Sequence, residues 1–301
     1  MKAIRIHRFG PPEVVVVDDV PLPSPGEGEV LVRVAAAGVG PWDAIIREGR
    51  SKVSPQPPLT LGSDLSGFVE AVGPAVIGFR VDDEVYGVTN PQFCDAQAEY
   101  AVASAGMIAP KPNSLSNLDA ASAPVIAVTA YQMLFEYAGA KQGETVMITG
   151  AAGNVGAYAV QLALQAGVRV VAVTRPGDDA ALRTLGAQII VDSCGTETLP
   201  EVEAVLDTVG GDTVERCVSA IKPGGKLVSV VSESLPERPD IQSIFFYAEV
   251  TTERLRMLSN LFEGGSISAR TGSILPLAQA RVAHEMLAGA PHKPGKIVLQ
   301  V

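Results

Sequence analysis

A glycine-rich turn between a strand and a helix constrains the fold of this chain more than any other segment. The apolar run Thr145–Thr149 is followed by glycines spaced G-x-x-G-x-x-G, at Gly150, Gly153 and Gly156, and then by a helix-forming stretch. So tight a turn needs residues without a Cβ, and it brings free backbone N–H groups and the positive end of a helix dipole toward an anion. The segment predicts a dinucleotide pyrophosphate site on a parallel α/β sheet, with a purely structural turn as the alternative.

Strand and helix patterns alternate beyond this turn, with glycines at the helix ends. This alternation is typical of a doubly wound parallel sheet. The further predicted strands are Arg169–Thr174, Gln188–Val191, Glu203–Thr208, Lys226–Val231 and Ile244–Val250, and the predicted helices are Val155–Ala166, Asp179–Leu185, Asp212–Ala220 and Thr252–Phe262.

The first 120 residues differ, because glycine and proline separate short apolar strands such as Val14–Val20, Glu29–Ala37, Gly67–Val72 and Glu84–Val88. This texture indicates an irregular β-barrel-like domain. A predicted helix over Ala120–Ala138, capped by Asp119, begins the α/β region. A final helix, Leu277–Ala288, and a strand, Lys296–Val301, are expected to rejoin the first domain. We therefore expect a β-barrel domain at 1–120 and 267–301 and an α/β domain at 121–266.

Charge and cysteine content limit the partners and the compartment. The chain has 23 Lys and Arg against 33 Asp and Glu, a net charge of −10, which disfavours nucleic acid or an anionic membrane as the main partner. No apolar run approaches the roughly 18 residues of a membrane span, and no secretory leader is recognised. The three cysteines form neither a CxxC pair nor a disulfide framework. We expect a soluble cytoplasmic protein with a small-molecule substrate.

The end of the strand after the glycine turn indicates which dinucleotide binds. NAD-preferring sites usually have Asp or Glu there, to bind the ribose 2′-hydroxyl. This chain has Thr174-Arg175, and a hydroxyl with a guanidinium suits a 2′-phosphate. NADP(H) is therefore the expected cofactor. In the alternative interpretation, Arg175 is a solvated surface charge, while Asp178 and Asp179 cap the next helix.

A series of short motifs resembles the medium-chain dehydrogenase/reductase superfamily, in its zinc-free NADPH:quinone oxidoreductase-like branch. The resemblance covers essentially the whole chain. It implies a GroES-like β-barrel catalytic domain and a Rossmann domain, with the active site in the cleft between them. Besides the glycine turn, the motifs lie at Gly38–Gly49, Leu61–Gly67, Val72-Gly73, Asp83–Gly87, Ala98–Tyr100, Thr129–Tyr131, Leu206–Gly211, Pro223–Gly225 and Gly295–Val298.

The resemblance also implies which residues contact the cofactor. The pyrophosphate turn corresponds to Ala152, Gly153, Asn154 and Val155, between Gly150 and Gly156. The adenosine-phosphate contacts correspond to Thr174 and Arg175. Further positions facing the adenosine and nicotinamide ends are Thr208, Val209, Val231 and Ser232, and Thr129 corresponds to a position that faces the nicotinamide.

Departures from the family pattern bear on catalysis. Zinc-dependent members have a Cys and a Gly-His-Glu where this chain has Gly40-Pro41 and Gly62-Ser63-Asp64. They also have a cluster of four cysteines that binds a structural zinc, whereas the first domain of this chain contains a single cysteine, Cys94. Zinc needs about four N, S or O ligands, so no metal is expected. The quinone reductase branch often has Asn at the position of Gly40 and Tyr at that of Ile45. Both are missing, so the usual polar groups cannot simply be transferred.

Reduction of a quinone or an enone builds negative charge on a carbonyl oxygen, which needs a hydrogen-bond donor and then a proton. Weak candidates are Tyr131, Trp42, Arg47 and Ser63, with Tyr86 and Asn90 beside them. The tyrosines could equally be wall or core residues. Asp43 and Arg47, four residues apart, suggest a structural ion pair, and Asp64 could accept loop N–H groups. No proton donor is assigned; the cofactor's ribose hydroxyl or water could serve.

The expected function is NADPH-dependent hydride transfer to a quinone or an α,β-unsaturated carbonyl, without zinc. The alternatives are an enoyl reductase of secondary metabolism and a catalytically silent NADPH-binding protein. A homodimer is also expected, because Ile244–Val250 is apolar on both faces and is the last strand of its sheet. Pairing across a two-fold axis would cover such an edge; cover by the helix Thr252–Phe262 is the alternative.

Overall fold

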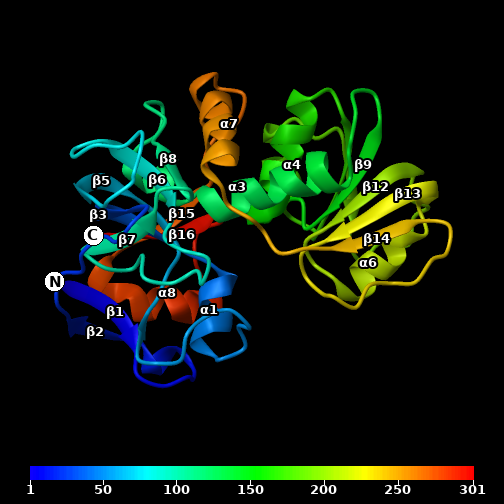
Figure 1. Cartoon of the computed structure of the whole chain (residues 1–301). Helices are drawn as coiled ribbons and strands as arrows, with labels where there is room; N and C mark the ends of the chain where they lie inside the picture. Colours follow the sequence, from blue (N-terminus) through cyan, green and yellow to red (C-terminus); the bar gives the residue numbers. More distant parts are fainter. The chain divides into compact units, whose positions relative to one another are not determined.

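A computed structural model describes residues 1–301 and divides into two compact units (Figure 1). The first unit comprises residues 1–125 and 250–301, and the second comprises residues 126–249. No helix combines the length and the apolar character that a membrane crossing requires.

The second unit is a six-stranded parallel sheet with the strand order β11-β10-β9-β12-β13-β14. Met147, Val171 and Val205 on its central strands are fully buried, as expected where helices cover both faces of a parallel sheet. The doubly wound Rossmann sheet is therefore confirmed. Its strands are β9 (Thr145–Thr149), β10 (Arg169–Thr174), β11 (Ile189–Asp192), β12 (Val202–Asp207), β13 (Ile221–Ser229) and β14 (Gln242–Phe245), and its helices include α4 (Asn154–Gln165), α5 (Asp179–Thr184) and α6 (Gly211–Val218).

The first unit contains a mostly antiparallel sheet in the order β15-β16-β3-β5-β6-β8, with β7 also paired to β3, and a small sheet in the order β2-β1-β4. The C-terminal strand β16 pairs antiparallel with β3, so the tail of the chain lies in this unit. Its strands are β1 (Lys2–Ile6), β2 (Val16–Asp19), β3 (Glu29–Val39), β4 (Leu59–Thr60), β5 (Asp64–Val72), β6 (Glu84–Val88), β7 (Tyr100–Ser104), β8 (Ile108–Pro110), β15 (Thr271–Pro276) and β16 (Lys296–Gln300), and its helices are α1 (Pro41–Arg47), α2 (Asn117–Ala121), α7 (Thr252–Glu263) and α8 (Ala280–Leu287), with short 3₁₀ turns η1 (Pro12–Val14) and η3 (Leu277–Gln279).

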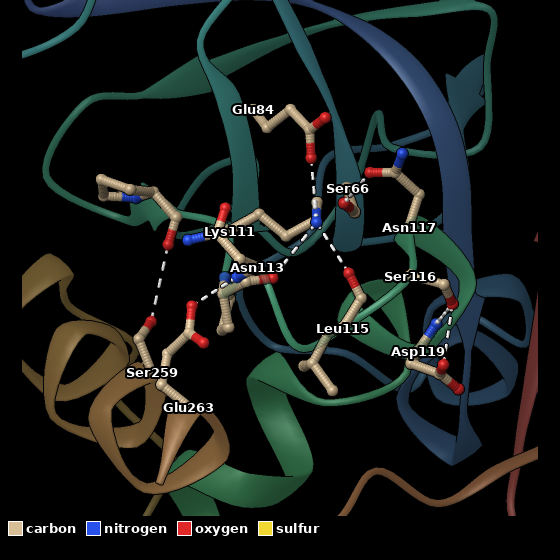
Figure 2. Close-up of polar contacts among 12 residues, drawn as sticks. Ser66, Glu84, Lys111, Asn113, Leu115, Ser116, Asn117, Asp119, Ser259 and Glu263 are labelled. Atoms are coloured by element: carbon tan, nitrogen blue, oxygen red, sulfur yellow. Dashed lines mark hydrogen bonds and ion pairs between the residues drawn. The ribbon is translucent and has the colours of Figure 1, made fainter.

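The single helix predicted over Ala120–Ala138 is wrong, because the structure has three helical segments there. They are α2, α3 (Pro124–Tyr131) and the π-helix η2 (Gln132–Tyr137). Pro124 has no N–H and restricts the residue before it, which ends α2. Asp119 is also not the cap: Ser116 Oγ accepts from the backbone N–H of Asp119, one turn earlier than predicted (Figure 2).

Helix α7 belongs to the first unit, whereas the sequence division assigns it to the second. The Tyr86 hydroxyl donates to the carbonyl of Leu255 at 2.7 Å, and Thr252 Oγ1 donates to the carbonyl of Ile108 at 2.6 Å. Figure 2 shows a further tie, in which the backbone N–H of Asn113 donates to Glu263. These contacts move the boundary from 266 to 249.

The strand expected over Ile244–Val250 is shorter in the structure, because β14 ends at Phe245. Beyond it, Phe246 stacks on Tyr137 with ring centroids 4.2 Å apart, and the backbone N–H of Glu249 donates to Gln132 Oε1 at 2.9 Å. The chain after β14 therefore packs on the π-helix instead of continuing the sheet.

Candidate functional site

The glycine turn joins β9 to α4 as tightly as its spacing predicts. Gly150 has a φ of +60°, and a Cβ there would lie 2.6 Å from Thr208 Oγ1 and 2.7 Å from Val209 Cγ2. A Cβ on Gly156 would lie 2.2 Å from the carbonyl oxygen of Gly150. Helix α4 begins at Asn154, and its N-cap, Gly153, makes no side-chain cap bond. The first N–H groups of α4 are thus suited to an anionic ligand.

Except for Thr129, which is on α3, the remaining predicted cofactor residues lie at the carboxyl edge of the same sheet. Because β9 pairs with β10 on one side and with β12 on the other, the strand order reverses between β9 and β12. Open α/β sheets bind ligands outside the carboxyl ends of their strands at such a switch point. Thr208 and Val209 follow β12, and Val231 and Ser232 follow β13 by two or three residues. Val209 and Val231 are 47% and 46% exposed.

A pocket of about 380 Å³ lies where β10 and β11 end. Thr174 and Arg175 line it, as do the carboxylate-bearing Asp179 and Asp192. Thr174 Oγ1 donates to Asp178 Oδ2 at 3.2 Å. Asp178 occupies the N-cap position of α5, but its side chain makes no cap bond there. The exposed side chain of Arg175 therefore lines the pocket together with the carboxylates of Asp179 and Asp192.

Two buried carboxylates lie in the first unit. Asp64 accepts from Lys296 Nζ at 2.8 Å, and its other oxygen accepts from the backbone N–H of Val125 at the start of α3, at 2.9 Å. The expectation that Asp64 accepts backbone N–H groups is confirmed. Asp43 accepts from the backbone N–H of Gly40 at 2.7 Å. Burial raises the pKa of Asp43 to about 7, although the Lys296 ammonium opposes the rise.

Arg47 does not pair with Asp43, so the predicted ion pair is wrong. Its guanidinium donates to the carbonyl of Gly10 at 3.0 Å and to Glu48 at 2.6 Å, and lies 3.0 Å from His284 Nδ1. Burial, reinforced by the Arg47 charge, lowers the pKa of His284 to about 3. Since Arg47 is 1% exposed, this cluster ties α1 to α8 inside the first unit.

The other polar candidates lie in both units. In the first, Trp42 packs edge-on against Phe93 with ring centroids 5.7 Å apart, and Ser63 is 4% exposed. In the second, Tyr131 packs against Phe135 at 5.0 Å, and Thr129 is buried on α3. Tyr86 is fully buried, and burial raises its pKa. Its hydroxyl bonds α7, which supports the core interpretation of that residue.

The residues at the family's zinc positions do not fit a metal ion. No three His, Cys, Asp or Glu side chains of the chain come together as a ligand set. Asp64 is bonded to Lys296, and Gly40 and Ser63 replace the cysteine and histidine ligands. Cys94 Sγ donates to Asp95 Oδ2 at 3.2 Å, and Asn90 Nδ2 donates to the Cys94 carbonyl. Burial raises the pKa of the Cys94 thiol. A protonated thiol is a poor metal ligand.

Two further residues of the site were missed as functional candidates from the sequence. Lys296 and Asp207 are 3% and 1% exposed. Lys296 is the single charged residue of β16 (Lys296–Gln300), and Asp207 ends β12 (Val202–Asp207), a strand that is buried at every position except Glu203. A charged residue in a buried strand is rarely left without a partner, and this signal could have identified both.

Comparison with known proteins agrees with this architecture. The alcohol dehydrogenase GroES-like domain family matches residues 26–113, and the zinc-binding dehydrogenase family matches residues 185–299. The quinone oxidoreductase of Lama guanicoe is 30% identical, with 99% of this chain and 97% of the relative covered. The NADPH-dependent alkenal/one oxidoreductase of Arabidopsis thaliana, a chloroplast protein, is 29% identical, with 99% and 79% covered.

A solved structure extends the likeness to three dimensions. The quinone oxidoreductase from Coxiella burnetii superimposes with a TM-score of 0.91 and 32% sequence identity, over 100% of this chain and 99% of that protein. Together with the GroES-like unit, the Rossmann unit and the glycine turn, this likeness identifies the chain as an oxidoreductase that belongs to the medium-chain dehydrogenase/reductase superfamily.

Proposed function

We propose that the protein is an NADPH-dependent oxidoreductase that transfers hydride to a quinone or an α,β-unsaturated carbonyl without zinc. The observation that carries the proposal is the strand–turn–helix at the sheet's switch point, in a chain whose full-length relatives include a quinone oxidoreductase and an NADPH-dependent alkenal/one oxidoreductase. Hydride transfer to a quinone, or to the β-carbon of an enone, leaves negative charge on a conjugated carbonyl oxygen in both substrate classes.

The residues around the glycine turn would hold the dinucleotide. The N–H groups of Asn154 and Val155 at the start of α4 would bind the pyrophosphate, aided by the helix dipole. Ala152 and Gly153 would shape the turn around it, since the N–H of Gly153 donates to the carbonyl of Gly150 at 2.8 Å. Thr208, Val209, Val231 and Ser232 would line the crevice from the neighbouring strand ends, with Thr129 toward the nicotinamide. When bound, the reduced nicotinamide supplies a hydride to the substrate.

The pocket at the ends of β10 and β11 supports NADPH over NADH. An arginine beside a hydroxyl at Thr174 offers charge-assisted bonds to a 2′-phosphate. Asp179 and Asp192 line the same pocket and would repel that phosphate, so we expect the preference for NADPH to be moderate.

The chain must also stabilise the oxygen that becomes negative after hydride transfer. Zinc would do this as a Lewis acid, but the ligand set does not fit a metal. The hydrogen-bond donors proposed for this role are Ser63, Trp42 and Tyr131, because Arg47 is engaged with Gly10, Glu48 and His284. The ribose hydroxyl of the cofactor or water remains an alternative proton source.

We further propose a cytoplasmic homodimer. β14 pairs only with β13 and is an edge strand, and Tyr247 just beyond it is 56% exposed. Cover of this edge by the helix Thr252–Phe262 is the alternative; in the structure the helix at these residues, α7, packs on β8. The three cysteines are free, which suits a reducing compartment. Light scattering at micromolar concentration should give twice the chain mass of 31.3 kDa; a monomer mass would contradict the dimer.

A steady-state screen tests the function. NADPH oxidation is followed with quinones, enones, enals and an enoyl thioester as acceptors, and we expect turnover with at least one of the first three classes. Turnover confined to an enoyl thioester would favour the enoyl reductase alternative. Tight NADPH binding without turnover on any acceptor would instead support a catalytically silent NADPH-binding protein.

A further inference from the structure

We propose that Asp207 is a positioning residue of the nucleotide site, which holds together three segments that face the cofactor. The inference rests on the NADP(H) site proposed above and adds a residue that acts through its neighbours. Asp207 ends β12 and is 1% exposed.

Four donors converge on the Asp207 carboxylate. Oδ1 accepts from Thr149 Oγ1 at 2.8 Å and from the backbone N–H groups of Val209 and Gly210 at 3.1 and 2.9 Å. Oδ2 accepts from Ser229 Oγ at 2.7 Å. A carboxylate is an acceptor only, so this all-donor surrounding matches it. Removing it would leave several buried donors without a partner, which is costly in a low-dielectric interior.

The bonds extend from Asp207 to the three segments. Thr149 Oγ1 also accepts from the backbone N–H of Thr208 at 3.0 Å, and Thr208 Oγ1 donates to the Thr149 carbonyl at 2.7 Å, immediately before Gly150. Ser229 Oγ accepts from the backbone N–H of Val231 at 3.1 Å. The network therefore joins the glycine turn, the segment after β12 and the segment after β13.

The network lies across the switch point of the sheet. Asp207 is in register with Ser229 on β13, and Leu206 is in register with Ile148 on β9. The bond between Asp207 and Thr149 therefore links the carboxyl ends of the two strands between which the strand order reverses. Because Gly150 packs closely on Thr208 and Val209, a shift of one segment displaces the other.

If Asp207 has this role, a variant that breaks its hydrogen bonds should bind both NADPH and NADH more weakly. In the proposed site, the segments held by Asp207 would face the pyrophosphate and the adenosine and nicotinamide ends, which both cofactors contain. The 2′-phosphate binds elsewhere, at Thr174 and Arg175 in this proposal. A variant of the network should weaken both cofactors alike, whereas an Arg175 variant should weaken NADPH alone.

The test compares Thr149→Val with Thr149→Ser. Valine has the shape of threonine but loses both hydroxyl bonds, whereas serine keeps them. Dissociation constants for NADPH and NADH are measured by calorimetry on the full chain, together with the melting temperature and the split between KM and kcat. We expect Thr149→Val to raise both dissociation constants roughly 5- to 30-fold, mainly through KM, and Thr149→Ser to stay within about twofold of wild type.

Asp207→Asn and Asp207→Ala give a second comparison. Asn retains one carbonyl oxygen for the Oδ1 donors, and its amide can donate to Ser229, so it should bind both cofactors better than Ala. If Asp207→Ala does not fold, the comparison of Thr149→Val with Thr149→Ser still tests the proposal. Wild-type affinities in Thr149→Val with a lowered melting temperature would overturn the positioning role and leave the proposed function standing. A loss confined to NADPH would also overturn it, and a wild type that binds neither nucleotide would overturn both.

Discussion

Lys296→Met measures how much a buried charge pair stabilises the first unit. Lys296 Nζ lies 2.8 Å from Asp64 Oδ2, and the two side chains are only 4% and 3% exposed. Methionine replaces most of the lysine stem, so the change removes the charge more than the packing. Breaking a buried pair typically costs about 3–5 kcal/mol, because the remaining charge stays buried without compensation. Here the buried Asp43 loses the same opposing charge, so we expect the upper part of that range.

The assay can report on this unit alone. Trp42 is the single tryptophan, and it lies on α1 in the first unit, so its fluorescence in urea follows the local transition. The control is Lys2→Met, which breaks an ion pair of 2.6 Å whose side chains are 52% and 75% exposed. Such exposed pairs contribute little to stability, because water and salt screen their charges.

A double variant distinguishes the cost of leaving the Asp64 charge without a partner from the contribution of the ion pair itself. Asp64→Asn with Lys296→Met removes both charges and keeps an oxygen for the N–H of Val125. It should therefore be less destabilised than Lys296→Met alone. Two results would refute the argument that an uncompensated buried charge sets the cost. One is a Lys296→Met variant that loses no more free energy of unfolding than Lys2→Met, and the other is a double variant whose loss equals the sum of the losses of its two single variants.

Three further predictions concern the cofactor, pH and metal. Arg175→Ala should raise the Kd for NADPH roughly 10-fold with little effect on the Kd for NADH, and Asp192→Asn should lower the Kd for NADPH. If Arg175→Ala weakened the binding of both cofactors equally, Arg175 would be a folding residue. Burial, opposed by Lys296, raises the pKa of Asp43 to about 7 in the folded state, so the folded state holds this proton more tightly than the unfolded chain. The free energy of unfolding should then fall as pH rises from about 4 to about 7, and urea titrations of Asp43→Asn should lack this slope. Dialysis against a strong chelator should leave NADPH oxidation unchanged; activity that is lost and then restored by zinc alone would contradict the zinc-free proposal.

The sequence was sufficient for the parts of the fold that depend on local patterns. The alternation of strands and helices predicted the doubly wound sheet, and the glycines at Gly150 and Gly156 predicted the tight turn that the structure has. Both signals lie within a few residues of the structure they specify, because a period of side-chain burial or a missing Cβ acts on the nearest backbone. The prediction over Ala120–Ala138 failed where Pro124 interrupts a continuous run of helix-forming residues.

Tertiary structure alone decided which buried polar side chains from distant segments meet. Asp64 and Lys296 are 232 positions apart, Arg47 and His284 are 237 apart, and Asp207 and Thr149 are 58 apart. The spacing of Asp43 and Arg47 predicted an ion pair that the folded chain does not make, because α8 brings His284 to Arg47 and β16 brings Lys296 toward Asp43 and Asp64. Such pairs form only when packing removes both partners from water, and no local sequence pattern specifies which segments pack together.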